Sequence, residues 1–196
     1  MRFGVLFLIL AAISGAWGSS HCQLAKSEEA ILGRALIKLE KLIQSKRGNN
    51  KAVTITLAEL YFPLSDDERS VMEKIRNFDP AKLKIKTPLL DCGGEPNDLV
   101  KISATKLRIR GKDHWIATQY LPKPVYDDLE AMMAAMLEDI GRELYVESGY
   151  RSEAYQLWLF ASGIKRRNYN AAETAKWIAL PGYSEHGCAK HQAVDF

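Results

Sequence analysis

The last sixteen residues, PGYSEHGCAKHQAVDF at positions 181–196, hold two of the four histidines, one of the three cysteines and the last aspartate of the chain. An imidazole nitrogen and a carboxylate oxygen both suit zinc, which makes His186 and Asp195 candidate metal ligands. A surface histidine and an aspartate at the end of a strand would explain the same two residues. The residues alone leave both interpretations open.

His191 is a rival ligand in the same stretch. If residues 191–196 form one strand, His191 and Asp195 share a face with their Cα atoms about 13 Å apart, at a rise of about 3.3 Å per residue. One ion would not easily reach both side chains. His186 is separated from that strand by Gly187 and a turn, so this limit does not apply to it.

Arg151 lies in the segment SGYRS at positions 148–152, between a glycine-containing turn and an expected helix. Its guanidinium can bind a carboxylate through two parallel hydrogen bonds, as a substrate-binding group or in a structural salt bridge. Gln156 lies about one helical turn further along, where it lines the same site or caps a neighbouring backbone group.

Composition describes a folded globular protein and excludes some classes of partner. The 196 residues are 47% hydrophobic and 26% charged, and we expect one domain. The formal charge is only +3, with basic and acidic residues interleaved, so a nucleic-acid partner is not expected. The basic run at 165–167 is typical of a solvated helix end.

The first eighteen residues predict an export signal. A charged Met1-Arg2 precedes an apolar run at 3–13 that is too short to span a bilayer comfortably. Small residues at Ala16 and Gly18 suit cleavage before Ser19. We therefore expect a periplasmic or secreted protein with no stable membrane anchor after cleavage.

The three cysteines, Cys22, Cys92 and Cys188, make an odd count for an exported chain. One disulfide and one spare thiol are expected in an oxidising compartment, and the sequence does not say which pair forms. Cys188 lies two residues from His186, so a role as a metal ligand stands beside a disulfide or simple packing.

The rest of the chain predicts separate helices and short strands. Apolar spacing and capping signals predict helices at 27–46, 65–78 and 124–140, and a further helix directly after SGYRS. The methionine stripe of 124–140 is expected in the core. Short strands are expected near 99–104, 115–120 and 144–146. This mixture predicts an α+β fold, a single domain with a small antiparallel sheet flanked by helices.

Several separated motifs occur in a fixed order: SGYRS followed by Tyr155-Gln156, then PGYSEH at 181–186, then QAVDF at 192–196. This ordered set resembles the VanY-type D-alanyl-D-alanine carboxypeptidases, a family of zinc peptidases that trims peptidoglycan stem peptides. The resemblance covers roughly residues 124–196. Residues 19–123 form a helical and mixed region without a family signature.

The resemblance implies a role for each candidate residue. His186 and Asp195 look like the first two ligands of a Zn²⁺ ion. Arg151 looks like the arginine that polarises the scissile carbonyl and steadies the oxyanion that develops on it. Ser184 looks like a contact to the substrate carboxylate, and Gln156 would help to shape the site.

Two features depart from the family pattern. The aspartate follows the histidine by nine residues, whereas the family places it at seven. The catalytic glutamate and the third zinc ligand of the family lie in a later Glu-x-x-His-like segment, and this sequence ends at Phe196 before any such segment. The expectation is a truncated peptidase core whose active site is incomplete.

Three functions compete on these observations. The leading hypothesis is an exported zinc D-alanyl-D-alanine carboxypeptidase-type hydrolase acting on peptidoglycan stem peptides that end in D-Ala, inactive if the missing groups are not supplied. The alternative is a non-catalytic module that binds such peptides through Arg151 and Ser184. The third is a secreted structural domain in which Cys92 and Cys188 form a staple.

Overall fold

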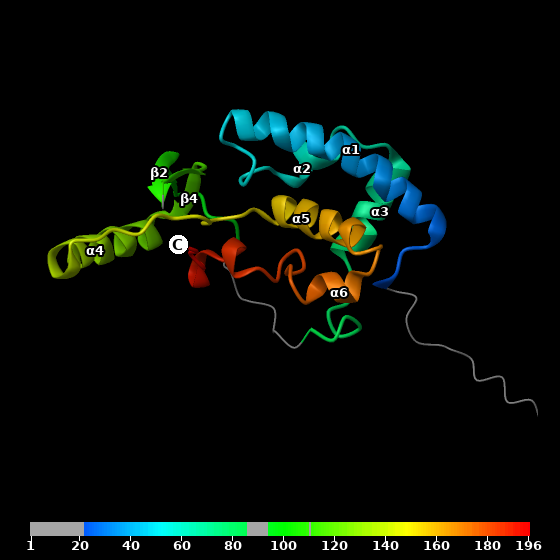
Figure 1. Cartoon of the computed structure of the whole chain (residues 1–196). Coiled ribbons are helices and arrows are strands. Elements are labelled where there is room, and N and C mark those ends of the chain that lie inside the picture. The colour runs from blue at the N-terminus through cyan, green and yellow to red at the C-terminus, as the bar shows by residue number, and fades with distance from the viewer. Residues whose placement is uncertain (1–21, 86–93, 110) are drawn as a thin grey trace, which may run out of the picture.

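The computed structural model describes residues 22–85, 94–109 and 111–196. The predicted signal peptide and Cys92 lie outside the described residues. Helix α5 (Glu153–Arg166) is central, with α1 (Lys26–Gly48) on one side and α6 (Ala171–Ala175) with the C-terminal segment on the other (Figure 1). Helices α2 (Leu57–Tyr61) and α3 (Asp66–Arg76) complete this helical part of the molecule.

Helix α1 confirms the predicted helix at 27–46. Five of its residues are buried at positions i, i+3, i+4, i+7 and i+11, which places them on one stripe of the helix: Leu32, Ala35, Leu36, Leu39 and Ile43. Acidic residues in the first turn and basic residues in the last turn complement the helix dipole. The chain then turns at Asn50, which has a φ of 58°.

Helix α3 begins at the predicted capping signal, where the Glu68 carboxylate accepts a hydrogen bond from the Ser65 N–H at 2.9 Å. Glu68 is buried, and Lys38 of α1 donates to the same carboxylate oxygen at 2.6 Å. The cap of α3 is therefore also an ion pair that ties α3 to α1.

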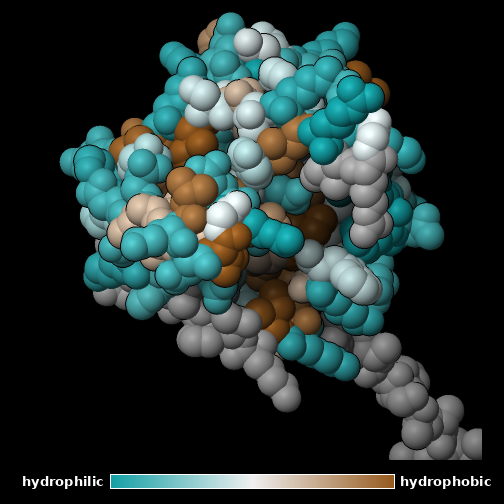
Figure 2. Space-filling model, turned by 60° about the vertical axis from the view of Figure 1, so that its left-hand side comes forward, coloured by the Kyte–Doolittle hydropathy of each residue, from teal (hydrophilic) through white to brown (hydrophobic). Residues whose placement is uncertain are grey.

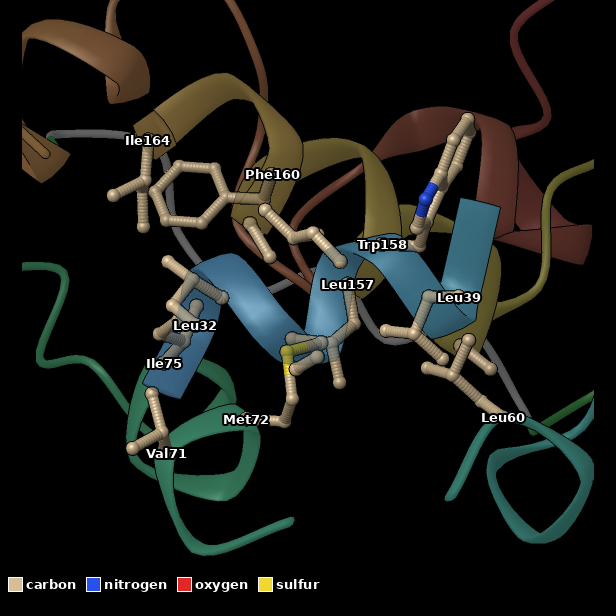
Figure 3. Close-up of a cluster of buried hydrophobic side chains, with 14 of the residues drawn as sticks. Leu32, Leu39, Leu60, Val71, Met72, Ile75, Leu157, Trp158, Phe160 and Ile164 are labelled. Atoms are coloured by element: carbon tan, nitrogen blue, oxygen red, sulfur yellow. The ribbon is translucent and has the colours of Figure 1, made fainter. Parts of the chain in front are cut away.

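The main hydrophobic core lies where α1, α2, α3 and α5 meet, and Figure 3 shows it in close-up. Its largest side chains include Leu39 of α1, Leu60 of α2, Met72 of α3 and Phe160 of α5, all of them fully buried. Much of this core comes from residues before position 123. The N-terminal region therefore packs on α5, which directly follows Arg151.

The described strands form two antiparallel pairs. Strand β1 (Leu99–Ile102) pairs with β4 (Gln119–Pro122), and between them β2 (Thr105–Ile109) and β3 (Lys112–Ile116) form a hairpin. Gly111 in its turn has a φ of 78°, a conformation that glycine adopts without strain. The expected strands at 99–104 and 115–120 are confirmed in part, but the sequence analysis missed the hairpin.

Helix α4 (Lys123–Ile140) confirms the predicted helix, but its methionine stripe is not core. Among its residues only Leu129 is buried, where it packs with Leu121 and Val146 in a second, small cluster. Met132 is 39% exposed. The amphipathic spacing predicted the helix correctly and its burial wrongly. Burial depends on a partner surface, and the main partner of α4 is the small β1–β4 pair.

The expected strand at 144–146 is wrong, and the strand considered for 191–196 does not form. Residues 144–146 are irregular, and residues 189–191 form a 3-10 helix, η3 (Ala189–His191), closed by a hydrogen bond from His191 N–H to the Cys188 carbonyl at 3.0 Å. Only Asp195 forms a bridge, with Ser148. A strand requires a neighbour along its length, which local apolar character does not guarantee.

The arrangement of helices and small antiparallel sheets confirms the α+β prediction. The face seen in Figure 2 is largely hydrophilic, with its hydrophobic residues in several separate groups. In the described part of the chain, no helix combines the length and apolar character needed to cross a membrane.

Candidate functional site

The site begins with a short contact between the turn before α5 and the end of the chain. Asp195 N–H donates to the Ser148 carbonyl at 2.9 Å, and Glu147 N–H donates to the Asp195 carbonyl at 2.8 Å. These backbone bonds hold the aspartate beside the SGYRS turn. Residues about fifty positions apart in the sequence thereby become neighbours.

His186 lies on the short 3-10 helix η2 (Glu185–Gly187) and is fixed to the same turn by two hydrogen bonds. Its backbone carbonyl accepts from Arg151 N–H at 2.8 Å, and its Nδ1 lies 2.9 Å from the Gly149 carbonyl oxygen. A carbonyl only accepts, so Nδ1 carries the proton and Nε2 of the neutral ring keeps a free lone pair. Metal-binding histidines are commonly oriented in this way, by a hydrogen bond from the ring nitrogen that does not bind the metal.

The charge state of His186 suits the same role. Burial lowers the pKa of the imidazole, and the nearby Arg151 guanidinium lowers the pKa further. The Gly149 bond and the Asp195 carboxylate act in the opposite direction with smaller effect. The neutral ring, which is the form that binds metals, is therefore favoured.

Arg151 is held beside both proposed ligands. Its Nη2 and Nε donate to the Ser148 hydroxyl at 2.6 and 3.1 Å, and its Nη2 lies 3.9 Å from Asp195 Oδ2. Burial lowers the pKa of the guanidinium, while the Asp195 charge opposes that shift. The contact to Asp195 is too long for the two-pronged salt bridge that was one expectation for this arginine, so donors remain for another partner.

A cavity of about 810 Å³ joins these groups. Its lining includes all five residues singled out from the sequence: Arg151, Gln156, Ser184, His186 and Asp195. Gln156 is 2% exposed and also caps the backbone, because its Nε2 donates to the Ala179 carbonyl at 2.7 Å. Both roles considered for Gln156 are therefore present, and its buried Oε1 finds no hydrogen-bond partner among the described residues.

The donor pair fits a zinc ion in chemistry and in spacing. His186 Nε2 and Asp195 Oδ2 are 3.4 Å apart. An ion about 2.1 Å from each of two ligand atoms at the tetrahedral angle holds those atoms about 3.4 Å apart. Residues 22–85, 94–109 and 111–196 contain no group of three or more His, Cys, Asp or Glu side chains placed to hold a metal, and a metal role for the His186–Asp195 pair stays a prediction.

His191 does not join this site. Its side chain is exposed and it does not line the cavity. The strand considered for 191–196 is absent, but His186 lines the cavity beside Asp195. The choice of His186 over His191 as a metal ligand stays a prediction. Cys188 is disulfide-bonded and Cys22 is free, as expected for one bridge and one spare thiol. Because Cys92 lies outside the described residues, the identity of the bridge stays a prediction.

Sequence reasoning missed several residues that build the site. Ser148 and Gly149 hold Arg151 and His186, yet only their place in the SGYRS motif pointed to them. Val53, from the loop between α1 and α2, lines the cavity, and its carbonyl accepts from Ser152 N–H at 2.8 Å. No local signal marked Val53, because its role arises from the packing of the N-terminal region on α5.

A family model matches the part of the chain that contains this site. A search of curated proteins and of solved structures found no significant match. The family model described as VanY, D-alanyl-D-alanine carboxypeptidase, matches residues 118–195, starting six residues before the expected boundary at 124. That segment contains every proposed site residue, and the match supports a D-alanyl-D-alanine carboxypeptidase-like fold for it. Residues 118–195 of this chain are therefore similar to the VanY family of peptidoglycan-acting carboxypeptidases.

Proposed function

We propose that this protein is an exported, zinc-dependent D-alanyl-D-alanine carboxypeptidase-type hydrolase acting on peptidoglycan stem peptides. The observation that carries the proposal is the 3.4 Å separation of His186 Nε2 and Asp195 Oδ2 in a cavity that Arg151 also lines. The matched family supplies the reaction class and the substrate. The expected signal at 1–18 supports export.

His186 and Asp195 would hold the zinc ion. A zinc ion in such a site supplies Lewis-acid chemistry, which acidifies water and polarises a carbonyl. The Gly149 carbonyl keeps His186 in the required tautomer, and partial burial keeps the imidazole neutral. Asp195 is fixed through its backbone by the bridge to Ser148.

Arg151 would bind the scissile carbonyl oxygen and stabilise the negative charge that develops on it. A positioned donor of this kind lowers the barrier because its interaction strengthens as the carbonyl becomes tetrahedral. Ser148 fixes the guanidinium beforehand through two hydrogen bonds. Ser184, which is largely buried in the cavity wall, would contact the substrate carboxylate. The buried Gln156 Oε1 atom, which has no hydrogen-bond partner among the described residues, would be available as an acceptor.

The alternative function is a non-catalytic module that binds peptidoglycan peptides through Arg151 and Ser184. A catalytic zinc site ordinarily has three protein ligands, whereas the part of the chain that the structure describes contains no group of three His, Cys, Asp or Glu side chains placed to hold a metal. This difference favours the non-catalytic module, so the experiment must measure zinc binding and D-alanine release separately from peptide binding.

The experiment compares zinc binding, peptide binding and D-alanine release in the wild type, His186→Ala and His191→Ala. His191 provides a matched control because it is a histidine five residues away that does not line the cavity. The enzyme hypothesis predicts zinc binding and D-alanine release that His186→Ala abolishes and His191→Ala retains. Peptide binding that survives both EDTA and His186→Ala, without release of D-alanine, would establish the module instead. If His186→Ala retains both zinc binding and peptide binding, the assignment of His186 as a zinc ligand is refuted.

A further inference from the structure

Helix α4 carries an apolar stripe that the fold covers only in part. Four residues follow the i, i+3, i+4, i+7 spacing that places them on one face of the helix: Met133, Met136, Leu137 and Ile140. Met133 packs partly buried against the small cluster around Leu129, whereas Leu137 and Ile140 are 53% and 60% exposed. The end of the stripe is therefore left open to solvent, as an unpartnered apolar surface.

The same helix is strongly acidic. Its 18 residues include five acidic side chains and one lysine, Lys123, which pairs with Asp127. Glu138 and Asp139, directly before Ile140, form no ion pair with any described residue. The end of α4 is thus amphipathic and negatively charged. An amphipathic helix with four apolar anchors at this spacing is the form that docks into a groove on a partner.

A groove of about 650 Å³ lies between α1 and α5. Its described lining comes from these two helices alone and includes Leu36 and Ile37, of which Ile37 is 58% exposed. Figure 1 shows α4 to the left of α1 and α5, and no residue of α4 lines the groove. The stripe of a chain therefore does not fill the groove of the same chain.

Cations dominate the charge of this groove. Lys41 of α1 and Lys165 and Arg166 of α5 line it, against one acidic residue among the described lining, Glu40. None of the three cations forms an ion pair with a described residue. A partner that fills the groove is therefore expected to be apolar where it packs and acidic beside that surface.

The stripe and the groove also match in length. The stripe runs from Met133 to Ile140, which is about 10 Å at a rise of about 1.5 Å per residue. The α1 residues that line the groove run from Leu36 to Gln44, which is about 12 Å by the same rise. Two turns of α4 therefore fit along the groove.

We propose that α4 of one copy of this protein docks into the groove between α1 and α5 of a second copy. The stripe packs on Leu36 and Ile37, and the carboxylates of α4 lie near Lys41, Lys165 and Arg166. Each copy presents both surfaces, so the contact either closes between two copies or continues along a row of copies. Neither surface shares a residue with the cavity of the candidate functional site, so this inference does not depend on the proposed function.

The test divides the contact between two variants. Leu137→Gln/Ile140→Gln removes the stripe and keeps the groove, whereas Lys165→Glu/Arg166→Glu reverses the charge of the groove and keeps the stripe. All four residues are exposed, so both variants should fold as the wild type does, which a thermal melt followed by circular dichroism checks. Sedimentation velocity then measures association at protein concentrations from about 1 μM to about 1 mM, the range expected for a small interface.

The wild type should associate as its concentration rises, and each variant alone should stay monomeric. An equimolar mixture of the two variants should form a one-to-one dimer, because the intact stripe of one variant docks into the intact groove of the other. Phe62→Gln is the control, because it removes an apolar side chain that is 88% exposed and belongs to neither surface. This control should associate as the wild type does.

Several results would overturn the proposal. They are a wild type that stays monomeric, either variant that still associates alone, and a mixture of the variants that stays monomeric. A monomeric wild type that binds phosphatidylglycerol vesicles, with binding that Lys165→Glu/Arg166→Glu abolishes, would overturn it as well. The groove would then belong to a contact with a lipid surface.

Discussion

Replacing Gly149 with alanine should damage the proposed zinc site without touching any ligand. A Cβ atom at this position would lie 2.4 Å from the backbone oxygen of Tyr120 and 3.1 Å from the Cδ2 atom of Leu121. Gly149 does not have a positive φ, so alanine is allowed by its backbone conformation and the strain comes from the contact alone. The neighbouring oxygen belongs to β4, which cannot rotate away as a flexible side chain would.

The size of the effect follows from this distance. Relieving the contact to an ordinary limit of 3.0 Å requires the two backbones to separate by about 0.6 Å. Overpacking of this kind typically costs about 1–3 kcal/mol of stability. The Gly149 carbonyl also fixes His186 Nδ1, and loss of a bond that orients a metal-binding histidine typically lowers metal affinity about 10- to 100-fold.

The assay combines urea unfolding of the zinc-free protein with zinc titration of the folded protein. Gly48→Ala is the control, because a Cβ atom there meets nothing within 4 Å at the end of α1 and alanine favours the helix. Gly149→Ala should lower both the unfolding free energy and the zinc affinity, while the control lowers neither. An unfolding free energy within 0.5 kcal/mol of the wild type, with zinc affinity unchanged within twofold, would refute the reasoning.

Two further predictions concern pH and capping. Burial and Arg151 lower the pKa of His186, so its contribution to the stability of the zinc-free protein is present above the ordinary histidine pKa of about 6.5 and is lost as the pH falls through the lower folded-state pKa. In urea unfolding measured across this pH range, the unfolding free energy of His186→Gln should therefore fall less steeply toward acid pH than that of the wild type. The same pH dependence in both proteins would contradict the assignment. Ser152 caps α5 and its Oγ donates to the buried Ile55 carbonyl at 2.6 Å, so Ser152→Ala should cost about 2–4 kcal/mol, against about 1 for Thr56→Ala at the exposed cap of α2. Equal losses in urea unfolding would show that the Ile55 contact contributes nothing.

The order of motifs in the sequence was enough to identify the family resemblance and to select His186, Asp195 and Arg151. The local sequence patterns were also enough to predict α1, α3 and α5, because the apolar spacing and capping signals of these helices lie within a few residues of one another. These features are local, and local patterns retain their meaning wherever the segment lies in the molecule.

The exposure of α4, the irregular backbone at 144–146 and the 3-10 turn at 189–191 depended on the tertiary structure. A half-apolar segment is buried, paired or left open according to which surface lies against it, and that surface comes from distant parts of the chain. The same reason explains why Val53 was missed as part of the cavity wall. The 3.4 Å approach of His186 to Asp195 is likewise set by the backbone bonds of both segments to the turn at 147–151, which no sequence spacing encodes.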